Sequence, residues 1–395
     1  MALVAMYLFW ICLFLVFYSY IGYGILIYIL VAIKKNLYGQ SDYSASHEPE
    51  VTLIIPAYNE AGFIETKIKN TLELNYPDSK LKIIFISDGS TDGTGAIIEK
   101  YTQFLHLYKP ERMGKPDAVN RAMAFVQTPI VIFCDANTLL NKDAIREIVK
   151  FYQDPKVGGV AGEKKVAGGS DDGAADAEGF YWKYESALKN LDSELHTVVG
   201  AAGELFSIRT HLFEHLPNNT ILDDFVMSMR ICQKGYVFKY EPKAYASELP
   251  SATIKNEQKR KIRISAGGFQ SMVMLKDLLN IFKYPVLSFQ YISHRVLRWA
   301  VCPFCLVVIF FLNIYLMFHY WPGLYTNIFI LQVAFYLMAF GGWILNRYSI
   351  KVKILYIPYY FVFMNLSVFL GLRRFLKGNQ SILWEKAFRA KSMTS

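Results

Sequence analysis

Charged side chains are missing from the first 33 residues of this 395-residue chain, and the pair Lys34 and Lys35 then follows. A helix of about 20 apolar residues crosses the hydrocarbon core of a bilayer, so this run is long enough for one span. No basic stretch precedes the apolar run and no small-residue cleavage site closes it, although a secretory signal peptide has both. We therefore expect residues 1–35 to form an uncleaved transmembrane helix. The basic pair places the following domain on the cytosolic side.

Asp, Glu, Lys and Arg are also absent from three later stretches, which are Trp299–Tyr320, Asn327–Leu345 and Ile354–Leu372. We expect residues 299–372 to form transmembrane segments and residues 373–395 to form a basic tail. Three full crossings would place Arg373 and Arg374 away from the cytosol, against the preference of basic residues for that side. Either the last stretch is re-entrant or the rule does not hold here.

A disulfide framework is absent, because the five cysteines are scattered along the chain. Cys302 and Cys305 have the spacing of a metal or redox pair, but they lie in an apolar run, which favours packing. Nucleic-acid binding is not indicated either. The net charge is +9, yet no basic helix interleaved with aromatic residues occurs outside the flanks of the apolar runs. Anionic lipid headgroups and a diphosphate substrate account for the excess charge.

Residues 48–265 have the pattern of an α/β domain. Val51–Pro56 is a continuous apolar stretch of the kind that a parallel sheet buries on both faces, and Leu81–Ser87 and Ile130–Cys134 are predicted to be the second and third strands. Helical spacing of apolar residues over Phe63–Leu74, and a helix expected to run to about Phe104, separate them. Residues 266–298 predict amphipathic helices at the membrane interface, with one helix over Gly267–Leu287.

Polar motifs follow each of the three predicted strands, where ligands of open parallel sheets bind. Asp88 begins a glycine-containing turn, and its carboxylate can accept hydrogen bonds from a base or a ribose; the alternative is a turn in which Thr91 or Asp92 caps a helix. Asp135 and Asn137 offer oxygen ligands for a divalent cation that would neutralise a diphosphate. A charged loop, Arg112–Lys115, precedes another helix.

The order of these motifs, from Val51–Glu60 through Ser87–Asp92 and Gly114-Lys115 to Asp135–Asn137, resembles the family 2 glycosyltransferases. The resemblance covers about 51–263, and the flanking apolar segments are similar to those of the hyaluronan, cellulose and poly-N-acetylglucosamine synthases. It implies a GT-A (Rossmann-like) fold, a UDP-sugar donor, Mg²⁺ or Mn²⁺, and inversion at the anomeric carbon. The donor-binding residues that it implies are Pro56, Tyr58, Glu60, Asp88, Lys115, Asp135, Arg260 and Arg263. Asp135 and Asn137 take the metal position, where the second family acid is here an asparagine.

The same resemblance implies a catalytic base. Leu222–Phe225 is similar to the family motif whose last aspartate takes the proton, which assigns the role to Asp224 beside Asp223. Adjacent carboxylates in an enclosed site raise each other's pKa, which suits a base. The alternative is two acids that stabilise a helix N-terminus.

The arginine of the next family motif corresponds to Arg263, which can bind a diphosphate bidentately. Arg260 stands where the family has glutamine, and Ile264 stands where it has tryptophan. An interfacial basic stretch is the alternative for this region.

On the acceptor side we expect Gly203, Glu204 and Trp182. Gly203 belongs to a small-residue loop, and the aromatic group around Trp182 suits stacking on a sugar ring, although helix packing is the alternative.

The sequence thus predicts an enzyme in the plasma membrane that moves a sugar from a nucleotide diphosphate sugar to a growing polysaccharide. Two alternatives remain, a single transfer to a lipid acceptor such as a polyprenyl phosphate or glycolipid, and a catalytically silent binding protein. The expected partners are the donor, a saccharide or lipid-linked acceptor and membrane lipids. No nucleic acid is expected, and partner subunits cannot be inferred.

Overall fold

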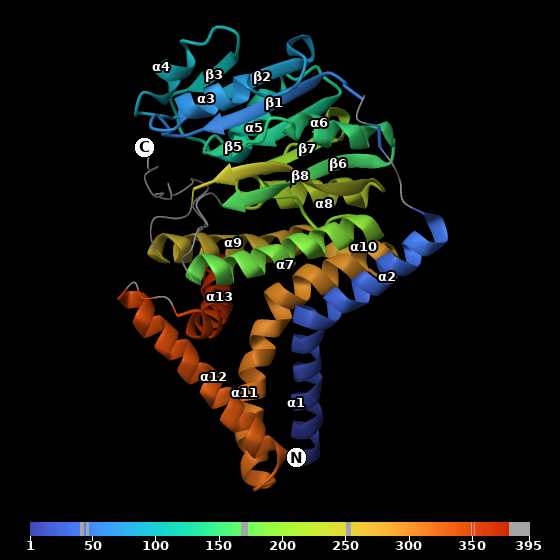
Figure 1. Cartoon of the computed structure of the whole chain (residues 1–395), viewed down its shortest axis with the longest axis vertical. Coiled ribbons are helices and arrows are strands. Elements are labelled where there is room, and N and C mark those ends of the chain that lie inside the picture. The colour runs from blue at the N-terminus through green and yellow to red at the C-terminus, as the bar shows by residue number, and fades with distance from the viewer. Residues whose placement is uncertain are drawn as a thin grey trace.

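The computed structural model describes residues 1–39, 43–44, 47–166, 173–249, 254–348, 350 and 352–378. A sheet domain lies above a layer of helices, and further helices extend away from that layer (Figure 1). The end of the predicted tail, residues 379–395, lies outside the described residues.

One mixed sheet of eight strands organises the domain, in the order β3-β2-β1-β4-β7-β6-β8-β5. Its parallel half consists of β1 (Val51–Ala57), β2 (Leu81–Asp88), β3 (Leu105–Lys109) and β4 (Ile130–Cys134). Every residue of β1 and β4 is buried, as their continuous apolar sequence predicts. Val51 at the start of β1 lies opposite Leu81 of β2 and opposite Ile130 of β4. The three predicted strands are parallel and in register, so their carboxyl ends lie at one edge of the sheet.

The other half of the sheet was not anticipated from the sequence. It consists of β5 (Thr138–Leu140), β6 (Val157–Val166), β7 (Leu205–Arg209) and β8 (Val237–Glu248). Strand β7 pairs antiparallel with both β4 and β6, whereas β6 and β8 are parallel. The expected helix to about Phe104 is also shorter, because α4 (Thr94–Ile98) ends early and β3 follows.

Helices cover both faces of the sheet. One core contains residues of α3 (Ile64–Leu72), α4 and α6 (Ala144–Val149). The core on the other face contains residues of α5 (Lys115–Met123), α8 (Asp223–Gln233) and α10 (Pro285–Tyr291). Because Leu287 and Tyr291 of α10 belong to the same core as the sheet, the domain and the adjoining helices form one packed unit.

The layer beneath the sheet contains α7 (Gly173–Leu195), α9 (Ile254–Met274) and α10 (Figure 1). The single amphipathic helix expected over Gly267–Leu287 is interrupted. Helix α9 ends at Met274, a 3₁₀ turn covers Lys276–Leu279, and Pro285 starts α10. Proline suits the first turn of a helix but not its interior, which explains the new start.

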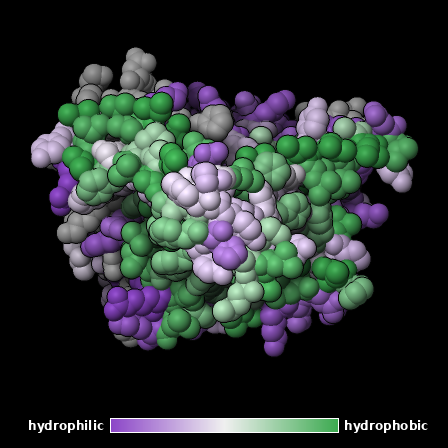
Figure 2. Space-filling model, turned by 90° about the horizontal axis from the view of Figure 1, so that it is seen from below, coloured by the Kyte–Doolittle hydropathy of each residue, from purple (hydrophilic) through white to green (hydrophobic). Residues whose placement is uncertain are grey.

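Four stretches in the described part of the chain are long and apolar enough to cross a membrane: Ala2–Tyr38, Pro285–His319, Leu324–Arg347 and Lys353–Leu376. The first joins α1 (Ala2–Phe17) and α2 (Tyr23–Tyr38) through a π-helical turn, and a second π-helix, Ile292–Val301, leads into α11 (Cys302–His319). Seen from below, these helices present mostly hydrophobic side chains around a more polar centre (Figure 2).

Helix α13 (Lys353–Leu376) runs in a different direction from the others. In Figure 1 it is seen nearly end-on beneath α9, whereas α1, α11 and α12 (Leu324–Arg347) run down the view. It is one continuous helix across the last apolar stretch, so the chain does not turn back within it. Arg374, near the end of α13, lines the cavity described below.

Candidate active site

A cavity of about 670 Å³ lies between the carboxyl ends of the parallel strands and the helices beneath the sheet. It brings together most of the residues predicted from the sequence: Tyr58, Glu60, Lys115, Asp135, Asn137, Trp182, Gly203, Glu204, Asp223, Asp224, Arg260 and Arg263. Pro56 and Asp88, which were also predicted for the donor, are buried in β1 and at the end of β2 and do not line it.

Asp88 holds the loop that precedes α5. Its carboxylate accepts hydrogen bonds from the backbone N–H groups of Met113 at 3.1 Å and Gly114 at 2.7 Å, and from the Arg121 guanidinium at 3.0 Å. Arg112 in the same loop lies 3.6 Å from the centroid of the Tyr58 ring. In this structure Asp88 therefore fixes the loop over the strand ends.

The turn after β1 is tied to the turn after β2. Asn59 has a positive φ of 52°, and its side chain accepts from the Thr91 N–H at 2.8 Å, while its own N–H donates to the Ser90 hydroxyl at 3.1 Å. Asp92 accepts from the N–H of Thr94, where α4 begins. The N-cap position of α4 is occupied by Gly93, so neither Thr91 nor Asp92 is the capping residue that was expected as an alternative, and Asp92 contacts the helix start from one residue before the cap.

Lys115 and Asp135 form a buried ion pair at the end of β4. The Lys115 ammonium donates to the Asp135 carboxylate at 2.6 Å. Burial alone would lower the pKa of Lys115, but Asp135, Asp223 and Asp224 raise it above its ordinary value, so this group stays cationic.

The turn that carries Asp135 and Asn137 is supported from below by Lys67. Lys67 is fully buried, and its ammonium donates to the Thr138 carbonyl at 2.8 Å and to the Cys134 thiol at 3.0 Å. Sequence reasoning missed this residue, because a lysine on the apolar face of a short helix carries no motif.

A divalent cation at this turn would be shared between protein side chains and a bound diphosphate. Among the described residues no group of three or more His, Cys, Asp or Glu side chains is placed to hold a metal. Asp135 and Asn137 supply one carboxylate and one amide, both oxygen donors of the type that Mg²⁺ and Mn²⁺ accept. Since Mg²⁺ usually keeps waters and binds substrate phosphates, two protein ligands suffice when a diphosphate supplies the others.

Asp223 and Asp224 open helix α8 at the centre of the cavity. Burial, and then the charge of Asp223, raise the pKa of Asp224 to about 7, against the opposing effect of Lys115. A carboxyl group with this pKa is half ionised near neutral pH and can take a proton from a hydroxyl.

Gly203 lets the loop before β7 pass close to these charges. A Cβ atom at this position would lie 2.9 Å from the Lys115 ammonium and 3.2 Å from an Asp224 carboxylate oxygen. The loop is held on α8 by a hydrogen bond from the Ala201 N–H to the Ser228 hydroxyl, at 2.9 Å. The predicted close approach of a small-residue loop is therefore present, and it is directed at the two charged groups.

An ion-pair ladder forms one wall of the cavity. Lys164 of β6 pairs with Glu204 at 2.6 Å and also with Glu248, and Arg260 lies 3.5 Å from Glu248. The Trp182 ring lies 5.8 Å from the Lys164 ammonium and 5.6 Å from that of Lys261. Lys164 and Glu248 were missed, because they meet only through the pairing of β6 with β8.

Arg263 faces the acids of the site without being tied to one of them. Among the described residues its guanidinium makes no hydrogen bond or ion pair, although Asp223, Asp135 and Asp224 act on it electrostatically. The Arg263 side chain is half-buried among these acids, and an anionic ligand would give its guanidinium a direct partner.

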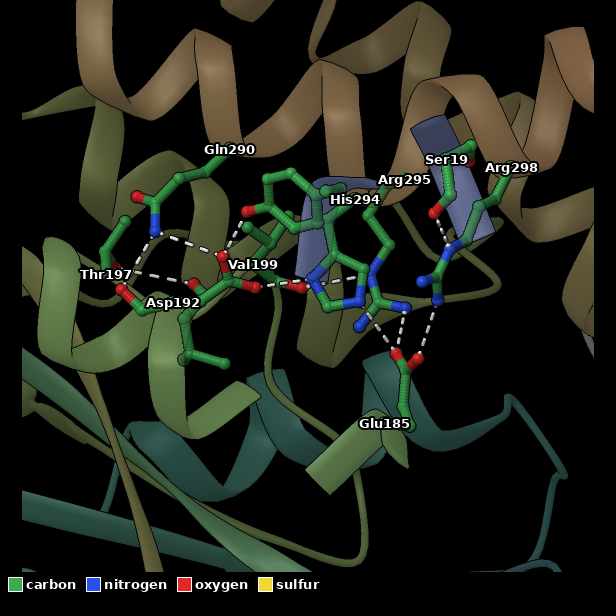
Figure 3. Close-up of polar contacts among 11 residues, drawn as sticks. Ser19, Glu185, Asp192, Thr197, Val199, Gln290, His294, Arg295 and Arg298 are labelled. Atoms are coloured by element: carbon green, nitrogen blue, oxygen red, sulfur yellow. Dashed lines mark hydrogen bonds and ion pairs between the residues drawn. The ribbon is translucent and has the colours of Figure 1, made fainter. Parts of the chain in front are cut away.

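The membrane-side half of the cavity contains residues that sequence reasoning also missed. Arg295, Arg298 and Trp299 come from the π-helix Ile292–Val301, and Glu185 comes from α7. Figure 3 shows both arginines converging on Glu185. Helix α13 contributes a mostly apolar wall. Their role depends on how helices pack, which no single motif records.

Comparisons with known proteins agree with this geometry. Residues 52–216 match the family described as glycosyl transferase family 2. The chain is 27% identical over 272 residues to a poly-beta-1,6-N-acetyl-D-glucosamine synthase of Staphylococcus aureus, a match that covers 66% of this chain and 64% of that protein. The corresponding synthase of Staphylococcus epidermidis is 26% identical over 250 residues, which cover 60% of this chain and 58% of the relative. The match thus spans less than two thirds of either relative.

Among solved structures, a mannosyltransferase from Pyrobaculum calidifontis in complex with GDP-Man and Mn²⁺ has a TM-score of 0.71. It is 21% identical, and the match covers 94% of this chain and 99% of the other. The likeness establishes the predicted fold, a GT-A domain joined to apolar helices.

Proposed function

We propose that the chain, whose residues 52–216 match glycosyl transferase family 2, is a membrane glycosyltransferase that inverts the anomeric carbon while moving a sugar from a UDP-sugar to a saccharide at the membrane. The observation that carries the proposal is the position of Asp224. Its carboxyl group, with a pKa of about 7, faces the cavity beside Lys115 and below the strand ends.

In the proposed reaction, a hydroxyl group of the acceptor attacks the anomeric carbon of the donor sugar. The new carbon–oxygen bond forms as the bond to the diphosphate breaks, and the nucleotide diphosphate leaves with the electron pair. Asp224 takes the hydroxyl proton, and Asp223 keeps the basicity of Asp224 high. Gly203 leaves room for the acceptor hydroxyl beside this carboxylate.

Arg263 binds the diphosphate, because a guanidinium stays charged and binds phosphate oxygens in pairs. Lys115 adds a second cation at the same end of the cavity. Asp135 and Asn137 would hold a divalent cation, which when bound neutralises charge on the diphosphate. Glu60 and Tyr58 line the nucleotide end, and Arg112 of the loop held by Asp88 lies against the Tyr58 ring.

The acceptor that we propose is a growing polysaccharide. The synthases of Staphylococcus support this choice, since their names describe polymers of N-acetylglucosamine. A lipid-linked acceptor is the second candidate, favoured by the apolar α13 wall of the cavity. The basic residues Lys34 and Lys35 after the first apolar run favour a cytosolic catalytic domain.

The test compares nucleotide release and sugar transfer for the wild-type protein and Asp224→Asn, with a panel of UDP- and GDP-sugars. The substitution removes only the proton acceptor, so transfer should fall by about 10²–10⁴-fold while donor binding persists. Addition of EDTA in the binding assay examines the Asp135–Asn137 turn. Near-normal transfer by Asp224→Asn would contradict the assignment of Asp224 as the base. Equal nucleotide affinity with EDTA and with Mn²⁺ would contradict a divalent-cation site at Asp135 and Asn137.

A further inference from the structure

We propose that Arg295 is a positioning residue for the proposed base. Its guanidinium, which Glu185 holds, supports residues 199–203 against the first turn of α8, where Asp224 lies. The inference rests on the function proposed above and adds a residue of the π-helix Ile292–Val301 to the same site.

The segment between α7 and β7 packs on the start of α8. The Ala201 N–H donates to the Ser228 hydroxyl, and this hydroxyl donates to the Phe225 carbonyl, both at 2.9 Å. Near the end of the segment, a Cβ atom at Gly203 would lie 3.2 Å from an Asp224 carboxylate oxygen. A shift of this segment would therefore move atoms that lie beside the base or contact the residue after it.

Arg295 supports the same segment from the π-helix. Its Nε donates to the Val199 carbonyl at 3.2 Å (Figure 3). The next residue, Gly200, has a φ of +87°, and a Cβ atom there would lie 2.0 Å from the Phe225 ring, so the backbone already lies against this ring. The Arg295 guanidinium also lies 5.7 Å from the centroid of the Trp299 ring, and that ring lies 5.3 Å from the ring of Phe225. Loss of Arg295 would thus remove a support of the segment and of the first turn of α8.

The Arg295 guanidinium is itself fixed by Glu185. The Arg295 Nη1 donates to the Glu185 carboxylate at 2.6 Å, and the same carboxylate accepts from Arg298 at 2.9 Å (Figure 3). Burial would raise the pKa of Glu185, but Arg295, His294 and Arg298 hold it well below its ordinary value, so the carboxylate is ionised. Because Arg295 uses one nitrogen for Glu185 and another for Val199, the plane of its guanidinium is set by two partners.

His294 joins Glu185 to a second buried carboxylate. The His294 Nε2 lies 3.0 Å from a Glu185 oxygen, and its Nδ1 contacts Asp192 (Figure 3). Asp192 also accepts hydrogen bonds from the Gln290 amide and the Tyr23 hydroxyl. Since Tyr23 belongs to α2, the place of Glu185 depends on α2, α7 and the π-helix together. The apolar helices can therefore act on the base without touching it.

A role in folding alone is the alternative, because a buried ion pair also fastens two helices to each other. The two roles differ in what a variant loses. A positioning role predicts a lower kcat with an unchanged KM for the donor and local loosening of residues 199–203. A role in folding alone predicts parallel losses throughout the domain.

The principal variant is Arg295→Met in the full-length protein, in phosphatidylcholine nanodiscs. It leaves Glu185 paired with Arg298 and His294, so the fold is disturbed little. Arg295→Lys keeps the positive charge, but a single ammonium replaces the two nitrogens that reach Glu185 and Val199. Hydrogen–deuterium exchange of residues 199–203 measures the local loosening. Nucleotide release from the sugar nucleotide that the panel above identifies gives kcat and KM.

Glu194→Gln is the matched control. Glu194 is also a carboxylate of α7 that pairs with a cation of an apolar helix, Lys35 at 3.0 Å, but it does not line the cavity. Glu185→Gln and its combination with Arg295→Met test whether the two residues act through one path. If they do, the double variant should be no slower than the slower single variant, because the same support is already lost.

We expect Arg295→Met to raise exchange of the amides in residues 199–203 about tenfold, since one supporting hydrogen bond is lost. Its kcat should fall about 10²-fold, as for a misplacement of about 1 Å, with the donor KM within about twofold of the wild type. Arg295→Lys should not restore kcat, and Glu194→Gln should behave as the wild type.

Four results would overturn the proposal. Unchanged exchange in Arg295→Met would mean that the segment does not need this support. Full recovery by Arg295→Lys would mean that charge alone is enough. An equal loss in Glu194→Gln would mean a general role in helix docking, and a donor KM that rises as much as kcat falls would mean damage to the whole domain.

The exchange measurement separates this inference from the function on which it rests. It reports on residues 199–203 whether or not the protein turns over a sugar nucleotide. If turnover occurs and Arg295→Met leaves exchange and kcat unchanged, only the positioning role fails. If no UDP- or GDP-sugar yields nucleotide release, the proposed function fails, and the link from Arg295 to catalysis fails with it even where exchange increases.

Discussion

The carboxyl group of Asp224 carries the pH dependence expected for this enzyme. Burial and Asp223 raise its pKa to about 7. A general base acts only when ionised, so the rate of transfer should be about half-maximal at pH 7. It should level off above that pH and fall about tenfold per pH unit well below it. Asp223→Asn removes a raising charge and should move this acid limb to lower pH.

The measurement is the pH profile of transfer at saturating donor. Asp143→Asn, an exposed carboxyl group outside the cavity, should leave the limb in place. If Asp223→Asn leaves the acid limb unmoved, the coupling between the two aspartates is not what sets it.

Gly203 is the second position where a single residue decides activity. A Cβ atom there would be 2.9 Å from the Lys115 ammonium, whose place is fixed by the 2.6 Å ion pair with Asp135. In Gly203→Ala the ammonium or the loop must shift, and a misplacement of about 1 Å can cost about 10²-fold in rate. We expect kcat to fall by about that factor, with the thermal unfolding midpoint nearly unchanged.

Gly62→Ala provides the control for this substitution, because a Cβ atom at Gly62 would have no neighbour within 4 Å. Steady-state kinetics of both variants, together with thermal unfolding, make the comparison. Equal kcat values for the two alanine variants would show that the close approach at Gly203 is not needed.

At this scale the sequence identifies residues that stand in ordered motifs. Asp135, Asp224 and Arg263 were predicted in this way, and all three line the cavity. Lys164 and Arg295 could not be predicted, because their partners, Glu204 and Glu185, are brought to them by sheet pairing and by helix packing. The roles of Asp135, Asp224 and Arg263 in catalysis remain predictions.

Among the elements, the parallel half of the sheet was the most predictable. Strands β1 and β4 are apolar runs that are buried throughout, and burial on both faces produces that pattern. Strand β2 has the exposed Lys82 near its start and is buried from Ile84 onward. The edge strand β3 has only exposed and half-buried residues. Strand β6 contains Gly158, Gly159 and Gly162, where a Cβ atom would collide with neighbouring residues, so its composition reads as a loop.

The crossing of α13 over α9 gives a prediction about a pair of elements. A Cβ atom at Gly371 would lie 2.5 Å from the Ser265 Cβ and 2.9 Å from the Ala266 nitrogen. In Gly371→Ala the two helices must separate, and over-packing of this kind costs about 1–3 kcal/mol. Because α13 forms the membrane-side wall of the cavity, kcat/KM for the acceptor should fall about tenfold, with nucleotide affinity unchanged.

The comparison for this variant is Gly341→Ala on α12, where a Cβ atom would be 3.8 Å from the nearest side chain, an ordinary contact. Acceptor titrations and nucleotide binding would be measured for both variants in the same nanodiscs. A loss of nucleotide affinity that matches the loss of transfer would place the effect in the fold as a whole and contradict a role for the wall.

For the whole molecule, the structure makes the sheet domain and the apolar helices parts of one site. Leu287 and Tyr291 share a core with the sheet, the Arg295 guanidinium donates to the Val199 carbonyl in the segment between α7 and β7, and Trp299 packs on Phe225. Sequence reasoning located the two regions separately, since each has its own composition. It could not predict their junction, which depends on contacts between residues about 100 positions apart.

A fragment from about residue 43 to residue 266 tests this junction. It retains every strand of the sheet, together with Lys115, Asp135, Asp224 and Arg263. It loses Arg295, Trp299 and the α13 wall, and it exposes the face of α7 that packs against α2 through Leu188. Mild detergent is therefore needed to keep the fragment soluble.

We expect this fragment to bind nucleotide, with affinity within about tenfold of the full chain, yet to transfer no sugar to a membrane acceptor. The physical reason is that positioning of the acceptor, which can account for about 7–11 kcal/mol of a barrier, depends on the lost helices. Calorimetry measures nucleotide binding, and a radiolabelled donor measures transfer, with the full-length protein in the same detergent as control. Transfer at the full-length rate would mean that the apolar helices only anchor the enzyme and that Arg295 and Trp299 are dispensable. Loss of nucleotide binding as well would mean that the helices also support the donor end of the cavity.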